Sequence, residues 1–268
     1  MTQPRLIATD LDGTLLRNDG SLSERTRKAL DLATAGGAEV VLVTARPPRY
    51  VDALVAAHQM TGTAVCSNGA LVYDIGSRTV LKSLSLEIAC ARAAADALTA
   101  EVPGIGFAVE TGHQVLFAPG YGLRLPEDAG AEFPVERVED LWQGKADIVK
   151  LLAWSAQHDV DAMLAVAERA AGALAQITHS GGRGLLEISA PGVTKAGTLS
   201  ELCAARGIGA ADVVAFGDMP NDLSILNWAG RPYAVASAHP AVLDAVQRHT
   251  RSNEDDGVAV VLEELFGC

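Results

Sequence analysis

Cysteine is scarce in this chain, and none of its four cysteines (Cys66, Cys90, Cys203 and Cys268) lies close enough to another to form a C-x-x-C pair. Closely spaced cysteines are typical of zinc sites and of small domains held together by disulfides. The spacing supports neither class. We therefore expect buried or incidental thiols in a reducing compartment.

Long apolar runs are also missing. Nowhere in the sequence do about twenty apolar residues follow one another, which is the length that a membrane-spanning helix needs. The N-terminus lacks the basic region and the uninterrupted apolar stretch of a signal peptide. We therefore expect a cytoplasmic protein with no membrane partner.

Positive charge is in deficit, since 21 lysines and arginines stand against 33 aspartates and glutamates, for a formal net charge of −12. Affinity for nucleic acid depends on cationic contacts with phosphate, so this balance argues against a nucleic-acid partner. The same negative charge repels a small phosphorylated molecule. A phosphate site in this chain must therefore supply its own local cations.

Aromatic residues make up only 4% of the chain, yet 49% of its residues are hydrophobic and glycine is abundant. Such a composition favours helices packed against a sheet over a disordered chain. The length of 268 residues suits one large or two smaller domains.

The most informative stretch is RLIATDLDGTLL, at residues 5–16, where an apolar strand runs directly into Asp10 and Asp12. Carboxylates are costly to bury unless they are paired or bound to a metal, and ligands bind at the carboxyl ends of strands in α/β sheets. Residues two apart in an extended segment point to the same side, so both acids can face one small group. An ordinary acidic loop or a calcium site is the alternative, but a calcium loop needs a third acid where Thr14 stands.

Two carboxylates in this arrangement suit phosphoryl transfer. One aspartate can attack phosphorus and form an acyl phosphate. The other can protonate the leaving oxygen and later activate water. Gly13 permits a tight backbone turn between the motif's residues.

A second short apolar strand is predicted at residues 39–43, after a helix with a serine at its start and a Gly-Gly stop. A strand–helix–strand order implies a parallel sheet, so Thr44 arrives at the same carboxyl edge as Asp10. The Thr44 hydroxyl and free backbone N–H groups there, including that of Ala45, can hold phosphate oxygens. Alternatively, Thr44 caps the helix that follows.

The pattern changes between residues 84 and 188, where paired strands accompany only two helices. This mixture indicates an inserted α+β domain, with residues 1–83 and 189–268 forming a parallel α/β core that has helices on both faces. Within the insert, helices are predicted at 88–98 and 160–173, and strands near 106–109, 115–118, 148–153 and 185–188.

The α/β pattern resumes after Pro191, and a buried strand at 213–216 leads into Asp218. Asp218 is placed to ligate a divalent cation together with Asp10 and the backbone carbonyl of Asp12, a hard oxygen site suited to Mg²⁺. Such an ion would also offset the repulsion between phosphate and these carboxylates.

Three further residues accompany this site. Lys195, at a helix start, can hold both the nucleophile and the phosphate, although a lone lysine there is ordinarily a surface residue. Asn221 and Asp222 can contact phosphate and bound water, and the alternative for Asp222 is a turn that caps a helix.

Four separated motifs, DLDGTLL, VTAR, GVTK and GDMPNDLSIL, together resemble the haloacid dehalogenase-like phosphatases, and more closely their Cof-type branch with an inserted α/β cap. The resemblance extends from Leu6 to the stretch at 253–257. Two departures stand at Ala45 and Ala196, where the branch usually has glycine; neither removes a reactive group.

This resemblance implies a role for each matching residue. Asp10 would be the nucleophile and Asp12 the general acid and base. The implied phosphate ligands are Thr44, Ala45, Lys195 and Asn221, the implied metal ligands are Asp10, Asp12 and Asp218, and Asp222 would support the site.

The predicted function is Mg²⁺-dependent hydrolysis of a small phosphomonoester, which can be a sugar phosphate, a nucleotide or a phosphorylated cofactor. A phosphomutase using the same covalent step is the alternative, followed by a non-catalytic protein that binds a phosphorylated ligand. We expect a monomer or small homo-oligomer. Candidate specificity residues in the insert are Glu110, His113, His179, Arg183 and Glu187.

Overall fold

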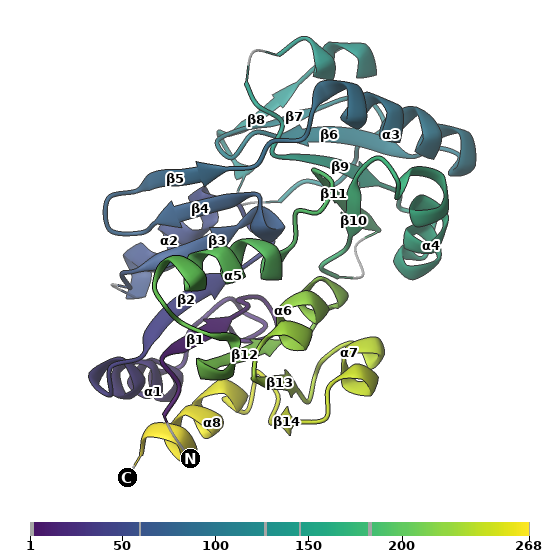
Figure 1. Ribbon diagram of the computed structural model, residues 1–268. Helices are drawn as coiled ribbons and strands as arrows, with labels where there is room; N and C mark the ends of the chain where they lie inside the picture. Colours follow the sequence, from purple (N-terminus) through teal and green to yellow (C-terminus); the bar gives the residue numbers. More distant parts are fainter. Residues whose placement is uncertain (1–2, 59, 126–127, 145, 182–183, 268) are drawn as a thin grey trace.

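The computed structural model describes residues 3–58, 60–125, 128–144, 146–181 and 184–267, and these form two sheets (Figure 1). The larger sheet belongs to the core and the smaller one to the inserted segment, which we call the cap. The chain changes from the core sheet to the cap after Ser83 and leaves the last cap strand at Ser189. The division into residues 1–83 with 189–268 and 84–188 stays a proposal for the domain boundaries.

The core sheet has the order β14-β13-β12-β1-β2-β3-β4-β5 within the described residues. Pairing is parallel from β14 to β3, and β4 and β5 continue it as antiparallel strands. The strands are β1 (Leu6–Thr9), β2 (Glu39–Val43), β3 (Thr63–Cys66), β4 (Leu71–Asp74), β5 (Thr79–Ser83), β12 (Val213–Gly217), β13 (Arg231–Val235) and β14 (His249–Thr250).

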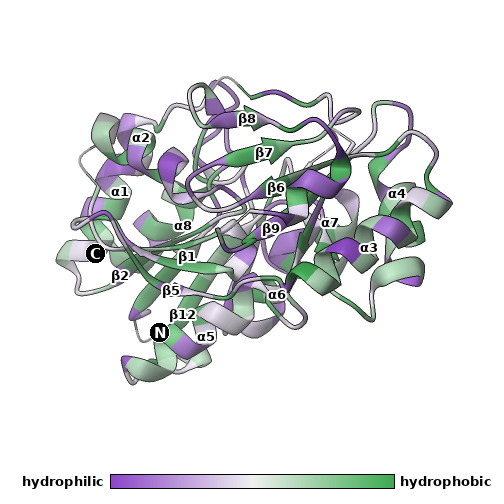
Figure 2. Ribbon diagram, turned by 90° about the horizontal axis from the view of Figure 1, so that it is seen from above, coloured by the Kyte–Doolittle hydropathy of each residue, from purple (hydrophilic) through white to green (hydrophobic). Residues whose placement is uncertain are grey.

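Helices cover both faces of this sheet because its central strands are apolar on both sides. Along β1, Ile7 packs into one hydrophobic cluster, whereas Leu6 and Ala8 pack into another. The apolar character of β1, β2 and β12 is visible from above (Figure 2). One face carries α1 (Glu24–Ala35), α2 (Pro48–His58) and α8 (Gly257–Phe266); the other carries α5 (Lys195–Ala205), α6 (Leu223–Trp228) and α7 (Pro240–Ala245). The predicted fold class, a parallel α/β core with an α+β insert, is confirmed.

The cap sheet has the order β10-β11-β9-β6-β7-β8 within the described residues. The helices α3 (Ile88–Glu101) and α4 (Val160–Ala171) cover its outer face and bury the cap's main hydrophobic cluster. The cap strands are β6 (Gly106–Glu110), β7 (Val115–Phe117), β8 (Glu132–Pro134), β9 (Lys150–Trp154), β10 (Gln176–Thr178) and β11 (Leu185–Ser189).

Short 3-10 turns complete the described elements: η1 (Ser67–Gly69), η3 (Val138–Trp142), η4 (Ala210–Asp212) and η5 (Pro220–Asp222). Of these, η1 follows core strand β3 directly and η5 follows β12 after Asp218 and Met219, at the edge where the predicted site lies. None of the described helices combines the length and the apolar character that crossing a bilayer requires.

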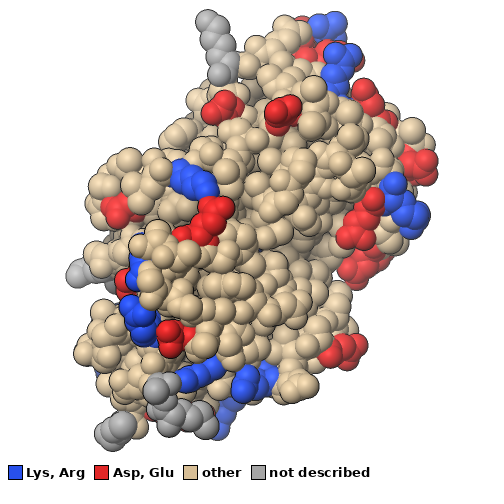
Figure 3. Space-filling view, in the orientation of Figure 1, with Lys and Arg blue, Asp and Glu red and all other residues tan. Residues whose placement is uncertain are grey.

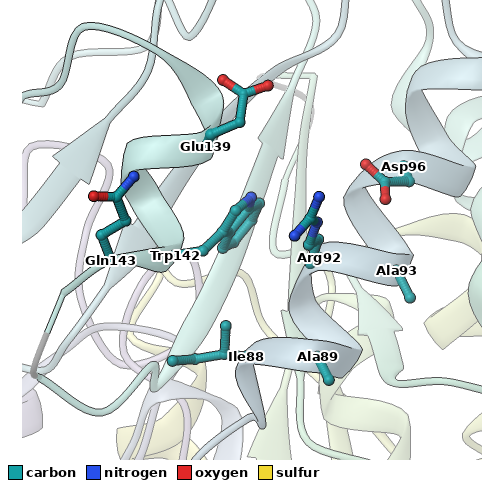
Figure 4. Close-up of a pocket in the computed structure, with 8 residues that line it drawn as sticks. All are labelled: Ile88, Ala89, Arg92, Ala93, Asp96, Glu139, Trp142 and Gln143. Atoms are coloured by element: carbon teal, nitrogen blue, oxygen red, sulfur yellow. The ribbon is translucent and has the colours of Figure 1, made fainter.

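An open cavity of about 730 Å³ lies on the cap between α3 and η3. Trp142 and Arg92 point into the space between these two helices, with Asp96 and Glu139 near its rim (Figure 4). No residue of the predicted site is among those that line it.

Candidate active site

Three neighbouring parallel strands deliver the predicted residues to one edge of the core sheet. β12, β1 and β2 lie side by side, with Phe216 opposite Thr9 and Thr9 opposite Leu42. Asp10, Thr44 and Asp218 follow the ends of these strands. The expectation that the carboxyl ends of the strands meet is therefore confirmed.

Lys195 joins two carboxylates at this edge. Its Nζ donates to Asp10 Oδ1 and to Asp222 Oδ1, each at 2.6 Å. Lys195 is 1% exposed, Asp10 6% and Asp222 0%, so the three charges are shielded from solvent together. A buried ion network of this kind holds its members in one geometry because breaking it leaves an unpaired charge.

Asp222 is fixed by its own chain segment. Its Oδ2 accepts from the backbone N–H groups of Asp218 at 3.0 Å and Met219 at 3.1 Å. Asp222 also stands at the start of α6, but its side chain makes no capping bond there. The structure thus brings Asp222 into the site as a support for Lys195 and for the turn that presents Asp218.

Asp218 approaches the first motif closely. Thr14 Oγ1 donates to Asp218 Oδ1 at 2.7 Å. A Cβ on Gly13 would lie 2.4 Å from Asp218 Oδ2, and the φ of Gly13 is +79°, so only glycine fits this turn.

Crowding of carboxylates sets the electrostatics of the site. Burial raises the pKa of Asp10 well above its ordinary value, Lys195 opposes the rise, and the neighbouring Asp222, Asp218 and Asp12 add to it. Burial, and next the charge of Asp222, raise the pKa of Asp218 to about 7. The pKa of Lys195 is raised by Asp10 and Asp222 against the effect of burial, so its ammonium stays charged.

The carboxylates of Asp10, Asp218 and Asp222 fit a small hard cation. Each offers an oxygen, and these oxygens lie within 4.8 Å of one another. A cation among them would relieve the repulsion that raises the pKa values of Asp10 and Asp218. The side chain of Asp12 stands outside this group, so its predicted part in metal binding rests on its backbone carbonyl and stays a proposal.

Asp12 is held by a residue of the second motif. Arg46 donates from Nε to Asp12 Oδ2 and from Nη2 to Oδ1, each at 2.8 Å. The Asp12 side chain is 48% exposed, whereas Asp10 behind it is buried. One carboxylate is therefore open to a leaving group and to water, and the other is enclosed.

Thr44 and Ala45 form a turn beside Asp10. Thr44 Oγ1 accepts from the backbone N–H of Arg46 at 3.0 Å. The next helix begins at Pro48, so the alternative that Thr44 is its N-cap is wrong. The roles of Thr44, Ala45 and Asn221 as phosphate ligands stay proposals.

A cavity of about 460 Å³ extends from Asp10 and Asp12 to the inner face of the cap. Of the specificity candidates, Glu110 and Glu187 line it. His113 is exposed, and His179 is buried and bonded to Asp161 at 2.9 Å; neither is among the lining residues. Arg183 lies outside the described residues.

Sequence reasoning missed Arg49, Asp128 and Lys150, which join the cap to the core together with the predicted Glu110 and Glu187. Arg49 of α2 donates to Glu110 at 2.9 and 2.7 Å and to Asp128 at 3.0 and 2.5 Å. Lys150 of β9 donates to Glu187 at 2.6 Å and to the backbone carbonyl of Ala45 at 2.8 Å. The only sequence signal was a lysine or glutamate within an otherwise apolar strand, which does not reveal its partner.

Known proteins share this organisation. A curated phosphatase of Bacillus subtilis (strain 168), named 5-amino-6-(5-phospho-D-ribitylamino)uracil phosphatase YwtE, is 28% identical over 98% of both chains. Pyridoxal phosphate phosphatase YbhA of Escherichia coli (strain K12) is 26% identical over 95% of this chain and 96% of its own. The solved structure of SMU.1108c from Streptococcus mutans UA159 shares the fold, with a TM-score of 0.86 and 21% sequence identity. The match covers 99% of this chain and 100% of that one.

The family model for haloacid dehalogenase-like hydrolases matches residues 7–262, almost the whole chain. This range contains all four motifs and the cap between the second and the third. The match confirms the resemblance and the prediction of a hydrolase: the chain belongs to the haloacid dehalogenase-like hydrolases.

Proposed function

We propose that the protein is a Mg²⁺-dependent phosphatase that hydrolyses a small phosphomonoester through an aspartyl phosphate. The contact between Lys195 Nζ and Asp10 Oδ1, at 2.6 Å beside the carboxylate of Asp218, carries this proposal. It joins a buried nucleophile to a permanent cation in a chain of formal net charge −12, which is the local positive charge that a phosphate site here needs.

In the first step, Asp10 attacks phosphorus with Oδ2, the carboxylate oxygen that accepts no hydrogen bond from Lys195. A bond forms between this oxygen and phosphorus, the bond to the leaving oxygen breaks, and Asp12 gives that oxygen a proton. In the second step, Asp12 takes a proton from water, the water oxygen bonds to phosphorus, and the bond to Asp10 breaks. Asp12 thus ends each cycle protonated again, as it began.

Asp10 and Asp218 would hold Mg²⁺, together with the backbone carbonyl of Asp12. When bound, the ion supplies positive charge that neutralises phosphate and the crowded carboxylates. Lys195 and the turn at Thr44 and Ala45 orient the phosphate oxygens. The cap encloses the reacting groups and excludes bulk water.

The inner face of the cap suggests the chemistry of the leaving group. The cavity there has an apolar wall built by Val115, Tyr121, Leu123, Leu125, Leu152 and Leu185. The charged residues that the cap contributes to this cavity are all in ion pairs: Glu110 and Asp128 with Arg49, and Lys150 with Glu187. A sugar with many hydroxyls would find few open partners, so we propose a leaving group that carries a flat, partly apolar ring. The two relatives are named as phosphatases of a uracil derivative and of pyridoxal phosphate, which supports this choice.

Phosphate release from a substrate panel tests the proposal. We expect Mg²⁺-dependent release from p-nitrophenyl phosphate and pyridoxal 5′-phosphate that disappears with chelator and in Asp10→Asn. Release that survives in Asp10→Asn would contradict the assigned nucleophile. Transfer of phosphate between substrate hydroxyls with little net release would instead identify a phosphomutase.

A further inference from the structure

Glu187, at the inner face of the cap, begins a chain of hydrogen bonds that ends in the core. Its Oε2 accepts from Lys150 Nζ at 2.6 Å and from Asn68 Nδ2 at 3.0 Å. Asn68 Oδ1 in turn accepts from Asn221 Nδ2 at 3.0 Å. The cap strands β9 and β11, which carry Lys150 and Glu187, lie beside each other above the core (Figure 1). Four side chains thus connect the cap to the segment that follows Asp218.

The direction of this chain is fixed by Glu187. Burial raises the pKa of Glu187, but the charge and the hydrogen bond of Lys150 and the hydrogen bond from Ser180 outweigh it. The pKa is therefore lowered, and the group is a carboxylate that only accepts. Asn68 must therefore present its NH₂ group to Glu187 and its oxygen to Asn221. Asn221 must then present its NH₂ group to Asn68.

The last residue of this series of hydrogen bonds, Asn221, has an acceptor atom without a donor in the described part of the chain. Asn221 is 8% exposed and lines the catalytic cavity, and its Oδ1 finds no hydrogen-bond partner among the described residues. Buried polar atoms are ordinarily satisfied, so an unpartnered oxygen at the cavity points to a ligand. The fully ionised phosphate ester carries no proton to donate. A water molecule at the reacting group does.

We propose that Glu187 is a positioning residue that acts through Asn68 to hold Asn221 as an acceptor for the hydrolytic water. The proposal rests on the proposed phosphatase function. One of the two N–H groups of the Asn221 amide donates to Asn68, so the expected donation to phosphate falls to the second N–H group and the amide oxygen accepts from water. It also means that the core site is complete only when the cap is closed, because Glu187 and Lys150 belong to the cap.

On the face shown in Figure 3, acidic and basic side chains are interspersed around a broad region without charged groups. Glu187 and its two partners, in contrast, are buried, and Lys150 and Asn68 both donate to Glu187: Lys150 is 4% exposed, Glu187 2% and Asn68 3%.

A double-mutant cycle between Glu187→Met and Asn221→Ala tests the proposal, with p-nitrophenyl phosphate as the substrate. Each single change should lower kcat roughly tenfold with little change in KM, the effect of leaving one buried acceptor or donor misaligned. Because Glu187 acts through Asn221, the double variant should again lose roughly tenfold. A loss of about a hundredfold would show independent effects and overturn the proposal.

Two matched variants separate positioning from stability. Glu187→Gln keeps the hydrogen bonds that run from residue 187 through Asn68 to Asn221, because the Lys150 ammonium turns the new amide oxygen toward itself and Asn68. The kcat of this variant should therefore stay within about threefold of wild type. Lys150→Met/Glu187→Met removes both charges, so its stability should approach that of wild type while kcat stays low. Recovery of kcat in this neutral pair would overturn the proposal.

A measurement without turnover completes the test. In wild type, the side-chain amide protons of Asn68 and Asn221 should give sharp, slowly exchanging NMR signals. In Lys150→Met/Glu187→Met they should exchange faster. Unchanged exchange rates would overturn the proposed positioning of Asn221 by Glu187. Absence of hydrolysis by wild type, or hydrolysis that survives in Asp10→Asn, would instead contradict the proposed function.

Discussion

Arg46 donates two hydrogen bonds, each of 2.8 Å, to the two carboxylate oxygens of Asp12. The planar guanidinium fixes the orientation of a carboxylate in a way that a lysine does not. Arg46 itself lies near the ring of Tyr50, its Cζ 4.6 Å from the ring centroid. The proposed acid and base is therefore held in place although its side chain is exposed.

The proposed roles of Asp12 predict an unequal effect on the two chemical steps. In Asp12→Asn, p-nitrophenolate can leave without a proton, so the first turnover should survive. The second step lacks its base, so steady-state turnover should fall by roughly 10²–10⁴-fold. A burst of p-nitrophenolate and a phosphorylated protein in the mass spectrum would show this. Equal loss of the burst and the steady state would contradict the base role of Asp12.

The raised pKa of Asp218 predicts how pH governs Mg²⁺ binding. In the metal-free protein this group titrates at about 7 when folded and at its ordinary 3.8 when unfolded. The folded state therefore binds the extra proton between these values, so this contribution to stability is full below 3.8 and is lost as pH rises through 7. Mg²⁺ needs the carboxylate, so the rise in Tm on adding Mg²⁺ should grow from acidic to alkaline pH.

Thermal unfolding with Mg²⁺ and with chelator, at several pH values from 5.5 to 8, measures this effect. Asp218→Asn is the control, because it should lose most of the Mg²⁺-induced shift at every pH. A shift that is the same across the whole range in wild type would contradict the assignment of Asp218 as a ligand.

Most of the core could be predicted from the sequence because its signals are local. The strand β2, at Glu39–Val43, has the predicted bounds, and α1 begins after a serine whose Oγ accepts from the N–H of Thr26 at 3.0 Å. Buried strands are apolar along their whole length, and acids at their ends stand out against that background.

The elements that were missed lack such a signal. β5, with an exposed Leu81, is an outer strand whose side chains alternate without burial; β8 contains a proline; and β14 has only two residues. Their strand pairing depends on the neighbouring strand rather than on their own composition.

The same limit applies to the site. The catalytic residues of the four motifs could be predicted from the sequence, because each acid or lysine follows a strand or begins a helix. The pairing of Arg49 with Glu110, 61 residues apart, depends on how the cap sits on the core, and that of Lys150 with Glu187, 37 residues apart, depends on how β9 and β11 pair within the cap sheet. Nothing in the sequence of either partner specifies the other.

Arg49 is expected to hold the cap against the core. Arg49→Met leaves the buried carboxylates of Glu110 and Asp128 without their cation, so unfolding free energy should fall by about 3–5 kcal/mol. Urea unfolding measures the loss, and small-angle scattering should show a more open molecule. Adding Glu110→Gln and Asp128→Asn should restore part of the stability, since no charge is then left unpaired. A loss of less than about 0.5 kcal/mol in Arg49→Met would show that the ion pairs of Arg49 with Glu110 and Asp128 are not needed to hold the cap against the core.

Leu152 tests whether the apolar wall selects the leaving group. It lies in β9 at 7% exposure and lines the catalytic cavity, so Leu152→Ala removes contact with a bound ring without touching the carboxylates. We expect kcat/KM for pyridoxal 5′-phosphate to fall roughly 10-fold or more, the effect of lost apolar contact in a pocket. Acetyl phosphate, which has no ring, should be hydrolysed nearly as before. Leu81→Ala is the matched control, because Leu81 is 60% exposed on β5 and absent from the cavity lining. Equal losses for both substrates in Leu152→Ala would mean that the wall supports the fold of the cap and does not contact the leaving group.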